Sequence, residues 1–103
     1  MSINKREILK NICYTELVYG RINKKLNVRF SKNQIEKNLY KIINETEEKF
    51  FSKIGKNFYI TNTENDIKIT INSNTFRVIT VDMIRGLKIR NFKNDTWFSK
   101  LFT

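Results

Sequence analysis

Apolar residues recur with a helical period in the first half of the chain and with a strand period in the second half. Three segments that begin at Asn4, Thr15 and Ser31 place them three or four positions apart, which indicates amphipathic helices. Asn4 and Ser31 are each followed three residues later by Glu or Gln, the pattern of a capping box. Gly20 interrupts the second segment at a cost of about 1 kcal/mol relative to alanine, so we expect it to mark a close helix contact.

The second half of the chain contains four short runs of strand-forming residues separated by polar turns. The run with Ile67, Ile69 and Ile71 alternates strictly with polar residues, as a strand with one buried face does. Gly55 lies in the first turn, where a hairpin needs a positive φ angle. The last run, Phe76 to Met83, is apolar on both sides, which predicts a central strand.

These patterns predict one α+β domain over residues 1–103, in which N-terminal helices pack on a four-stranded antiparallel meander. The helical half covers residues 1–48 and the sheet covers residues 49–83. A basic C-terminal segment follows at residues 84–103, and we expect it to end in a short helix. A chain of this length buries one modest core and has no room for a second domain.

The net charge is +10, from 20 Lys and Arg against 10 Asp and Glu. One explanation of this charge is the codon bias of an AT-rich genome, which favours Lys, Asn and Ile, all abundant here. The distribution is uneven, however, since residues 1–30 carry +5, residues 31–48 carry −1, residues 49–83 carry +2 and residues 84–103 carry +4. A basic surface attracts RNA, DNA or an acidic protein. We therefore expect cations from both ends of the chain to share one face.

The composition argues against several classes of chemistry. The chain has no His and one Cys, so it offers no imidazole base, no His or thiolate metal site and no intramolecular disulfide. Its three glycines do not form a phosphate-binding or dinucleotide-binding pattern. It contains no apolar run long enough for a membrane span and no signal-peptide core. We expect a cytoplasmic protein without cofactor, metal or membrane partner.

Several short blocks resemble the domain-of-unknown-function family 3781, a group of uncharacterised bacterial proteins. The longest blocks are Thr15 to Leu17, Gly55 to Tyr59, Ile71 to Ser73 and Val78 to Thr80, and the resemblance covers about residues 7–84. It implies a compact bacterial α+β domain and no particular activity. Family members tend to carry Ala-His-Lys after the last of these blocks, where this chain has Val81-Asp82-Met83. This chain therefore lacks that histidine and any function that it has in other family members.

Basic and aromatic side chains are the candidates for binding nucleic acid or a protein partner. Cations neutralise phosphates, while an aromatic ring stacks on an unpaired base. Alternation allows Lys53 and Tyr59 to lie on one sheet face, although the register that decides this is not readable from sequence. The nine candidates are Lys53, Lys56, Tyr59, Arg77, Arg85, Lys88, Arg90, Lys93 and Trp97. Asp82 is expected to pair with Arg77 or Arg21.

The leading hypothesis is a small non-enzymatic module, bacterial or carried by a phage or mobile element, that binds nucleic acid or a nucleoprotein complex. A second hypothesis is a phage-encoded inhibitor of a bacterial defence nuclease, in the manner of anti-CRISPR proteins. A third is a ribonuclease toxin like RelE or barnase, with Lys56, Tyr59, Arg77 and Lys53 placed around the RNA phosphate. The apolar residues near Trp97 also allow a homodimer.

Overall fold

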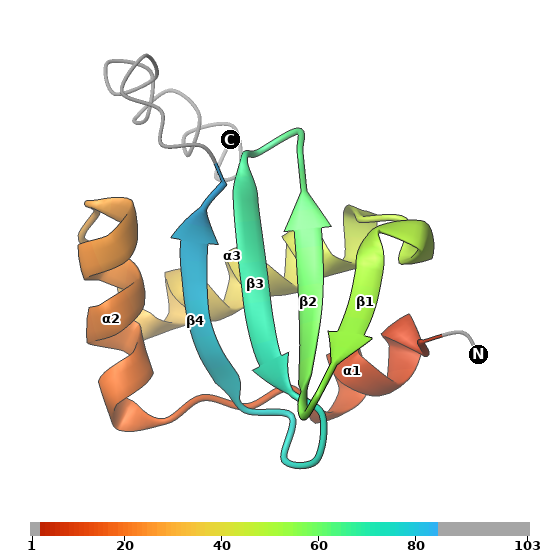
Figure 1. Ribbon diagram of the computed structural model, residues 1–103. Coiled ribbons are helices and arrows are strands. Elements are labelled where there is room, and N and C mark those ends of the chain that lie inside the picture. The colour runs from red at the N-terminus through yellow and green to blue at the C-terminus, as the bar shows by residue number, and fades with distance from the viewer. Residues whose placement is uncertain (1–2, 85–103) are drawn as a thin grey trace.

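Three helices and a four-stranded antiparallel sheet form one α+β unit (Figure 1). The computed structural model describes residues 3–84. The strands follow the order β1-β2-β3-β4, so the predicted meander is confirmed. The predicted C-terminal helix lies outside the described residues. In chain order the elements are α1 (Lys5–Asn11), α2 (Glu16–Leu26), α3 (Lys32–Glu45), the 3-10 helix η1 (Glu48–Phe50), β1 (Phe51–Ile54), β2 (Asn57–Asn62), β3 (Ile67–Asn72) and β4 (Val78–Met83).

The helices begin at the capping residues that the sequence indicates. The side chain of Asn4 accepts a hydrogen bond from the Glu7 amide at 3.1 Å. Ser31 and Gln34 form a reciprocal capping box, with bonds of 3.2 and 2.9 Å between side chains and backbone amides. Thr15 occupies the N-cap of α2 without a side-chain cap bond. Local side-chain chemistry therefore fixes where α1 and α3 begin.

The first hairpin turns in two residues. Ile54 pairs with Asn57, so Gly55 and Lys56 form the turn, and Gly55 has a φ of +62°. A glycine at the first central position is what a type II′ turn requires. The predicted role of Gly55 is therefore confirmed.

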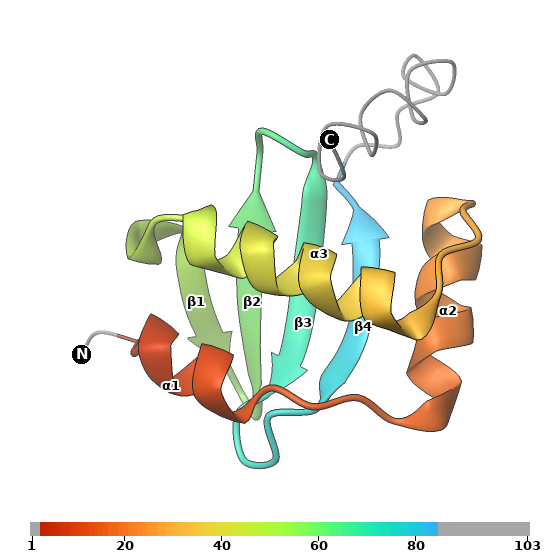
Figure 2. The same ribbon diagram turned by 180° about the vertical axis from the view of Figure 1, so that it is seen from behind.

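Two helices, α1 and α3, cover one face of the sheet (Figure 2). Most apolar residues of the strands point to that face, with the exposed Ile54 of β1 an exception, and Ile67, Ile69 and Ile71 are fully buried as their alternation predicts. Together with Ile42 and Ile43 of α3, they form the centre of the core. Burial of such side chains contributes about 1.5–3 kcal/mol each and supplies most of the stability of the domain.

The strand β4 lies at an edge of the sheet, so the prediction of a central strand is wrong. Its outer side is covered instead by α2, which packs along it (Figure 1). The segment before α2 also pairs with the start of β4, since the Cys13 carbonyl accepts the Val78 amide at 2.9 Å. Arg21 donates to the Ile79 carbonyl at 3.3 Å. This cover explains the apolar character of β4 and blunts an open sheet edge.

Gly20 lies on the exposed side of α2, so the expected close helix contact is wrong. A Cβ atom added there would meet nothing within 4 Å. Because glycine in a helix interior costs about 0.5–1 kcal/mol, Gly20→Ala should raise the free energy of unfolding by that amount in a urea titration. Gly55→Ala is the control and should lower it, since φ there is +62°. A loss of stability in Gly20→Ala would contradict this description of α2.

Candidate nucleic-acid interface

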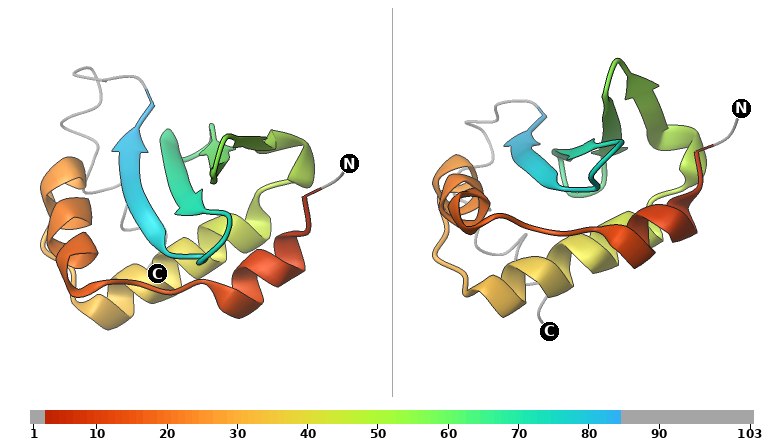
Figure 3. Two further views of the ribbon diagram at one scale, coloured as in Figure 1. Left: turned by 60° about the horizontal axis from the view of Figure 1, so that its bottom comes forward. Right: turned by 90° about the horizontal axis from the view of Figure 1, so that it is seen from below.

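Among residues 3–84, no helix crosses the face of the sheet opposite α1 and α3 (Figure 3). Strand pairing places Ser52, Tyr59, Thr70 and Thr80 in one row across this open face. Ser52 is exposed, Tyr59 and Thr80 are half-buried, and Thr70 is buried. We call this surface the open face. It consists largely of hydroxyl side chains around a single aromatic ring.

A second row on the open face adds charge beside that ring. Thr61 pairs with Lys68, which pairs with Asp82. The Lys68 ammonium nitrogen lies 5.5 Å from the centroid of the Tyr59 ring, within the range of a cation–π contact. The ring of Tyr59 is therefore held next to a cation, and its neighbours Ser52 and Thr61 are short.

The helix α2 forms one border of the open face. Lys25 bonds the Asp82 carboxylate at 2.6 Å, so the predicted partners Arg77 and Arg21 are wrong. Helix geometry explains the outcome, because Arg21 and Lys25 are one turn apart and both face β4. Arg21 donates a hydrogen bond to the Ile79 carbonyl, so Lys25 is the cation that lies opposite Asp82. The ion pair with Lys25 neutralises the negative charge that Asp82 brings to the open face.

Two arginines line a small hollow between α2 and β4. Its volume is about 200 Å³, and its lining includes Arg21, Arg77 and Leu17, of which Leu17 is 81% exposed. Lys24 lies one turn beyond Arg21 on α2. No ion pair or hydrogen bond of the Arg77 or Lys24 side chains is found within residues 3–84. Both are therefore available to an anionic ligand.

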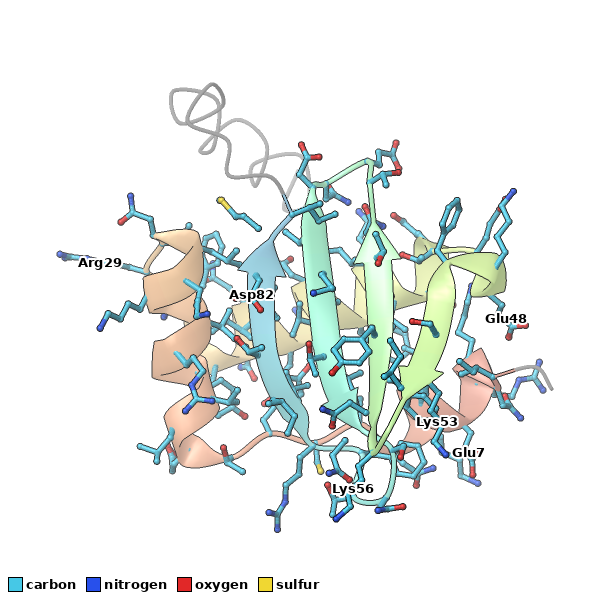
Figure 4. The ribbon with its side chains drawn as sticks, viewed as in Figure 1. Glu7, Arg29, Glu48, Lys53, Lys56 and Asp82 are labelled. Atoms are coloured by element: carbon cyan, nitrogen blue, oxygen red, sulfur yellow. The ribbon has the colours of Figure 1, made fainter. Side chains whose placement is uncertain are left out.

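The register separates Lys53 from Tyr59. Ser52 pairs with Tyr59 while Lys53 pairs with Phe58, so Lys53 and Tyr59 point to opposite faces of the sheet. Lys53 instead lies beside Glu7 of α1, in a pocket at the outer edge of β1 (Figure 4). The four residues proposed for RNA cleavage are thus not assembled around one phosphate.

The turns bring two further candidates to the same end of the sheet. The Ser73 amide donates to the Lys56 carbonyl at 2.7 Å, and the Asn72 amide donates to the Arg77 carbonyl at 2.9 Å. Lys56 and Arg77 are both exposed there. The remaining candidates lie outside the described residues, namely Arg85, Lys88, Arg90, Lys93 and Trp97.

The cations of residues 1–30 do not share one face. Those of α1 are Lys5, Arg6 and Lys10, and α1 lies on the other side of the sheet from the open face (Figure 2). Those of α2 flank β4, whose end lies beside the C-terminal end of α2 (Figure 1). The cations of residues 1–30 therefore do not all contribute to the one basic face expected from both ends of the chain, and the C-terminal cations of that prediction lie outside the described residues. Only the α2 group lies near the point from which the chain continues to Arg85.

Sequence reasoning missed Tyr19, which joins α2 to α3, and Tyr14, which packs on it. The Tyr19 hydroxyl donates to Glu36 at 2.6 Å, and its ring stacks on Tyr14 with centroids 5.5 Å apart. Burial, followed by the contact with Glu36, raises the pKa of Tyr19 to about 12. Burial also raises the pKa of Tyr14. Both phenols are neutral near pH 7, so this cluster holds two helices together and supplies no phenolate.

Comparison with known proteins identifies a family but no individual relative. A family model described as a protein of unknown function (DUF3781) matches residues 6–82. No curated protein and no solved structure matches the chain. Among residues 3–84, no helix combines the length and the apolar character that crossing a bilayer requires. The family match confirms the resemblance found in the sequence, and it brings no activity with it.

Proposed function

The chain belongs to this family of unknown function, and we propose that it is a module that binds single-stranded nucleic acid across the open face and the basic border formed by α2. The observation that carries the proposal is the position of Tyr59 on a sheet face that no helix within residues 3–84 covers, with Lys68 beside it. An open antiparallel sheet with an exposed aromatic ring is a known way to present a stacking surface to unpaired bases.

The charges around Tyr59 suit a phosphate backbone. Among residues 3–84, the side chains of Arg77 and Lys24 have no ion pair or hydrogen bond, and the hollow that Arg77 lines lies between α2 and β4 at the border of the open face. Lys68 can turn from the Tyr59 ring to a phosphate when a base takes its place on the ring. Ser52 and Thr61 offer hydroxyl groups to phosphate or base edges.

Binding to unpaired bases distinguishes this surface from one that only attracts polyanions. Double-stranded DNA hides the faces of its bases, so Tyr59 contributes nothing to its affinity. Sequence preference should be weak, because every base has a face on which a ring can stack. We place the protein in the cytoplasm, where such ligands and reduced Cys13 coexist.

A fluorescence anisotropy titration with a labelled single-stranded oligonucleotide tests the proposal. Binding should weaken linearly on a logarithmic salt scale. Tyr59→Ala should reduce the affinity for the single strand about fivefold, which is the lower end of the range for loss of one stacked base. The lower end is expected because Lys68 already occupies one side of the ring. Its affinity for a duplex of the same length should stay unchanged.

The control is Phe50→Ala, which removes another ring that has a lysine over it. Lys49 lies 5.4 Å from the Phe50 centroid, and Phe50 is 42% exposed at the side of the sheet farthest from α2. Binding should be unaffected in this variant. The proposal is wrong if the protein binds no oligonucleotide at low salt. Capture of a host protein that persists after nuclease treatment would then favour the inhibitor hypothesis.

A further inference from the structure

Residues of α1 and α3 line a groove. Both helices lie on the side of the sheet away from the open face (Figure 2). The volume of the groove is about 710 Å³, within the range of about 300–1,000 Å³ that small-molecule sites occupy. The two helices run antiparallel, so α1 and α3 form its opposite walls. The interface proposed above uses none of its lining residues.

Hydrogen bonds fix one end of the groove. The Lys5 ammonium donates to the Asn44 carbonyl at 2.9 Å, and the Lys5 amide donates to a carboxylate oxygen of Glu48 at 3.1 Å. These bonds hold the start of α1 against the end of α3. The other oxygen of Glu48 accepts no hydrogen bond from a described residue, so it can accept one from a ligand hydroxyl.

The charges of α1 are sorted between its two sides. Arg6 and Lys10 line the groove, are exposed, and have neither an ion pair nor a side-chain hydrogen bond to any residue in the described range. Glu7 instead lines the pocket on the sheet side of α1, together with Lys53 (Figure 4). The groove therefore concentrates cations on its α1 wall, and its negative charge is confined to Glu48 at one end.

The opposite wall offers an aromatic ring. Tyr40 of α3 is 50% exposed and lines the groove, and Leu9 of α1 supplies a half-buried apolar surface. A large ring left half in solvent is able to cover a flat ligand. Asn44, one turn from Tyr40, adds an amide.

The geometry points to a binding site for a nucleoside phosphate in this groove. The base lies against Tyr40 and Leu9, and the phosphate lies between Arg6 and Lys10. Guanidinium and ammonium groups bind phosphate through charge-assisted hydrogen bonds, while Glu48 accepts from the sugar. This site is separate from the open face, so it can be tested independently of the proposed function.

Titration of the full-length protein with a fluorescent adenosine diphosphate tests the site. The nucleotide should bind saturably, and both adenosine and inorganic phosphate should compete far more weakly than unlabelled adenosine diphosphate. Arg6→Gln with Lys10→Gln should weaken binding roughly tenfold or more, as loss of a charged hydrogen bond does. Tyr40→Ala should weaken it about fivefold, as loss of one stacked base does.

Two controls separate the groove from general polyanion attraction. Lys41→Gln removes one positive charge from α3 outside the groove lining, and Tyr59→Ala alters the open face, so both should leave nucleotide affinity unchanged. Thermal melting confirms that each variant is folded. Absence of saturable binding overturns the inference, as does binding that the Arg6, Lys10 and Tyr40 variants leave intact. Equal weakening by Tyr59→Ala also overturns it.

Discussion

Replacing Asn62 with alanine is expected to lower the free energy of unfolding by about 3 kcal/mol. The Asn62 side chain donates to the Thr46 hydroxyl at 2.8 Å and accepts two bonds from Asn65, at 2.8 and 3.0 Å. The Thr46 hydroxyl in turn donates to the Ile42 carbonyl at 2.6 Å. This buried network ties the end of α3 to the turn between β2 and β3. Without Asn62, the amide groups of Asn65 remain buried without their acceptor.

Chemical denaturation monitored by circular dichroism measures this loss. Asn33→Ala is the matched control, because it removes the same side chain from the exposed surface of α3. It should change the free energy of unfolding by less than about 0.5 kcal/mol. If both variants unfold at the same denaturant concentration, the polar network contributes nothing and this explanation is wrong.

Neutralising Lys24 and Arg77 together should reduce the affinity for a single-stranded oligonucleotide about 25-fold at 0.1 M salt. Each phosphate contact with a single strand adds about 0.7 to the slope of log affinity against log salt concentration. At 0.1 M salt, that slope corresponds to about a fivefold gain in affinity per contact. Arg77 lines the hollow between α2 and β4, and Lys24 lies one turn beyond Arg21 on α2; within residues 3–84 neither side chain has an ion pair or hydrogen bond. The variant is Lys24→Gln with Arg77→Gln, and its salt slope should fall by about 1.4.

The matched control is Lys37→Gln with Lys41→Gln. This control removes two positive charges, as the Lys24 and Arg77 variant does. Both of its lysines are exposed on α3, on the other side of the sheet from the open face. The affinity of this control for the oligonucleotide should fall far less than that of the Lys24 and Arg77 variant. Equal losses in the two variants would mean that net charge alone drives binding and that no particular surface is used.

Local signals in the sequence predicted much of the fold correctly. The caps at Asn4 and Ser31, the positive φ of Gly55 and the buried alternation of Ile67 to Ile71 all depend on residues within a few positions. Neighbouring residues determine such features, so they can be recognised without a structure. The order of strands in a meander follows from the same short turns.

The candidate site was less predictable because it depends on contacts distant in sequence. Pairing register put Tyr59 beside Lys68 and moved Lys53 to the other face, and a shift of one residue would have reversed this. The apolar character of β4 suggested a central strand, whereas α2 supplied the cover. Asn62 resembled an ordinary turn residue, because its partner Thr46 belongs to another element.

Amide chemical shifts recorded during titration with a single-stranded oligonucleotide locate the bound surface residue by residue. The largest changes are expected on Tyr59, Lys68, Arg77 and the residues of α2 from Leu17 to Lys25. Changes confined to α1 and α3, or no changes at low salt, would contradict the proposed interface.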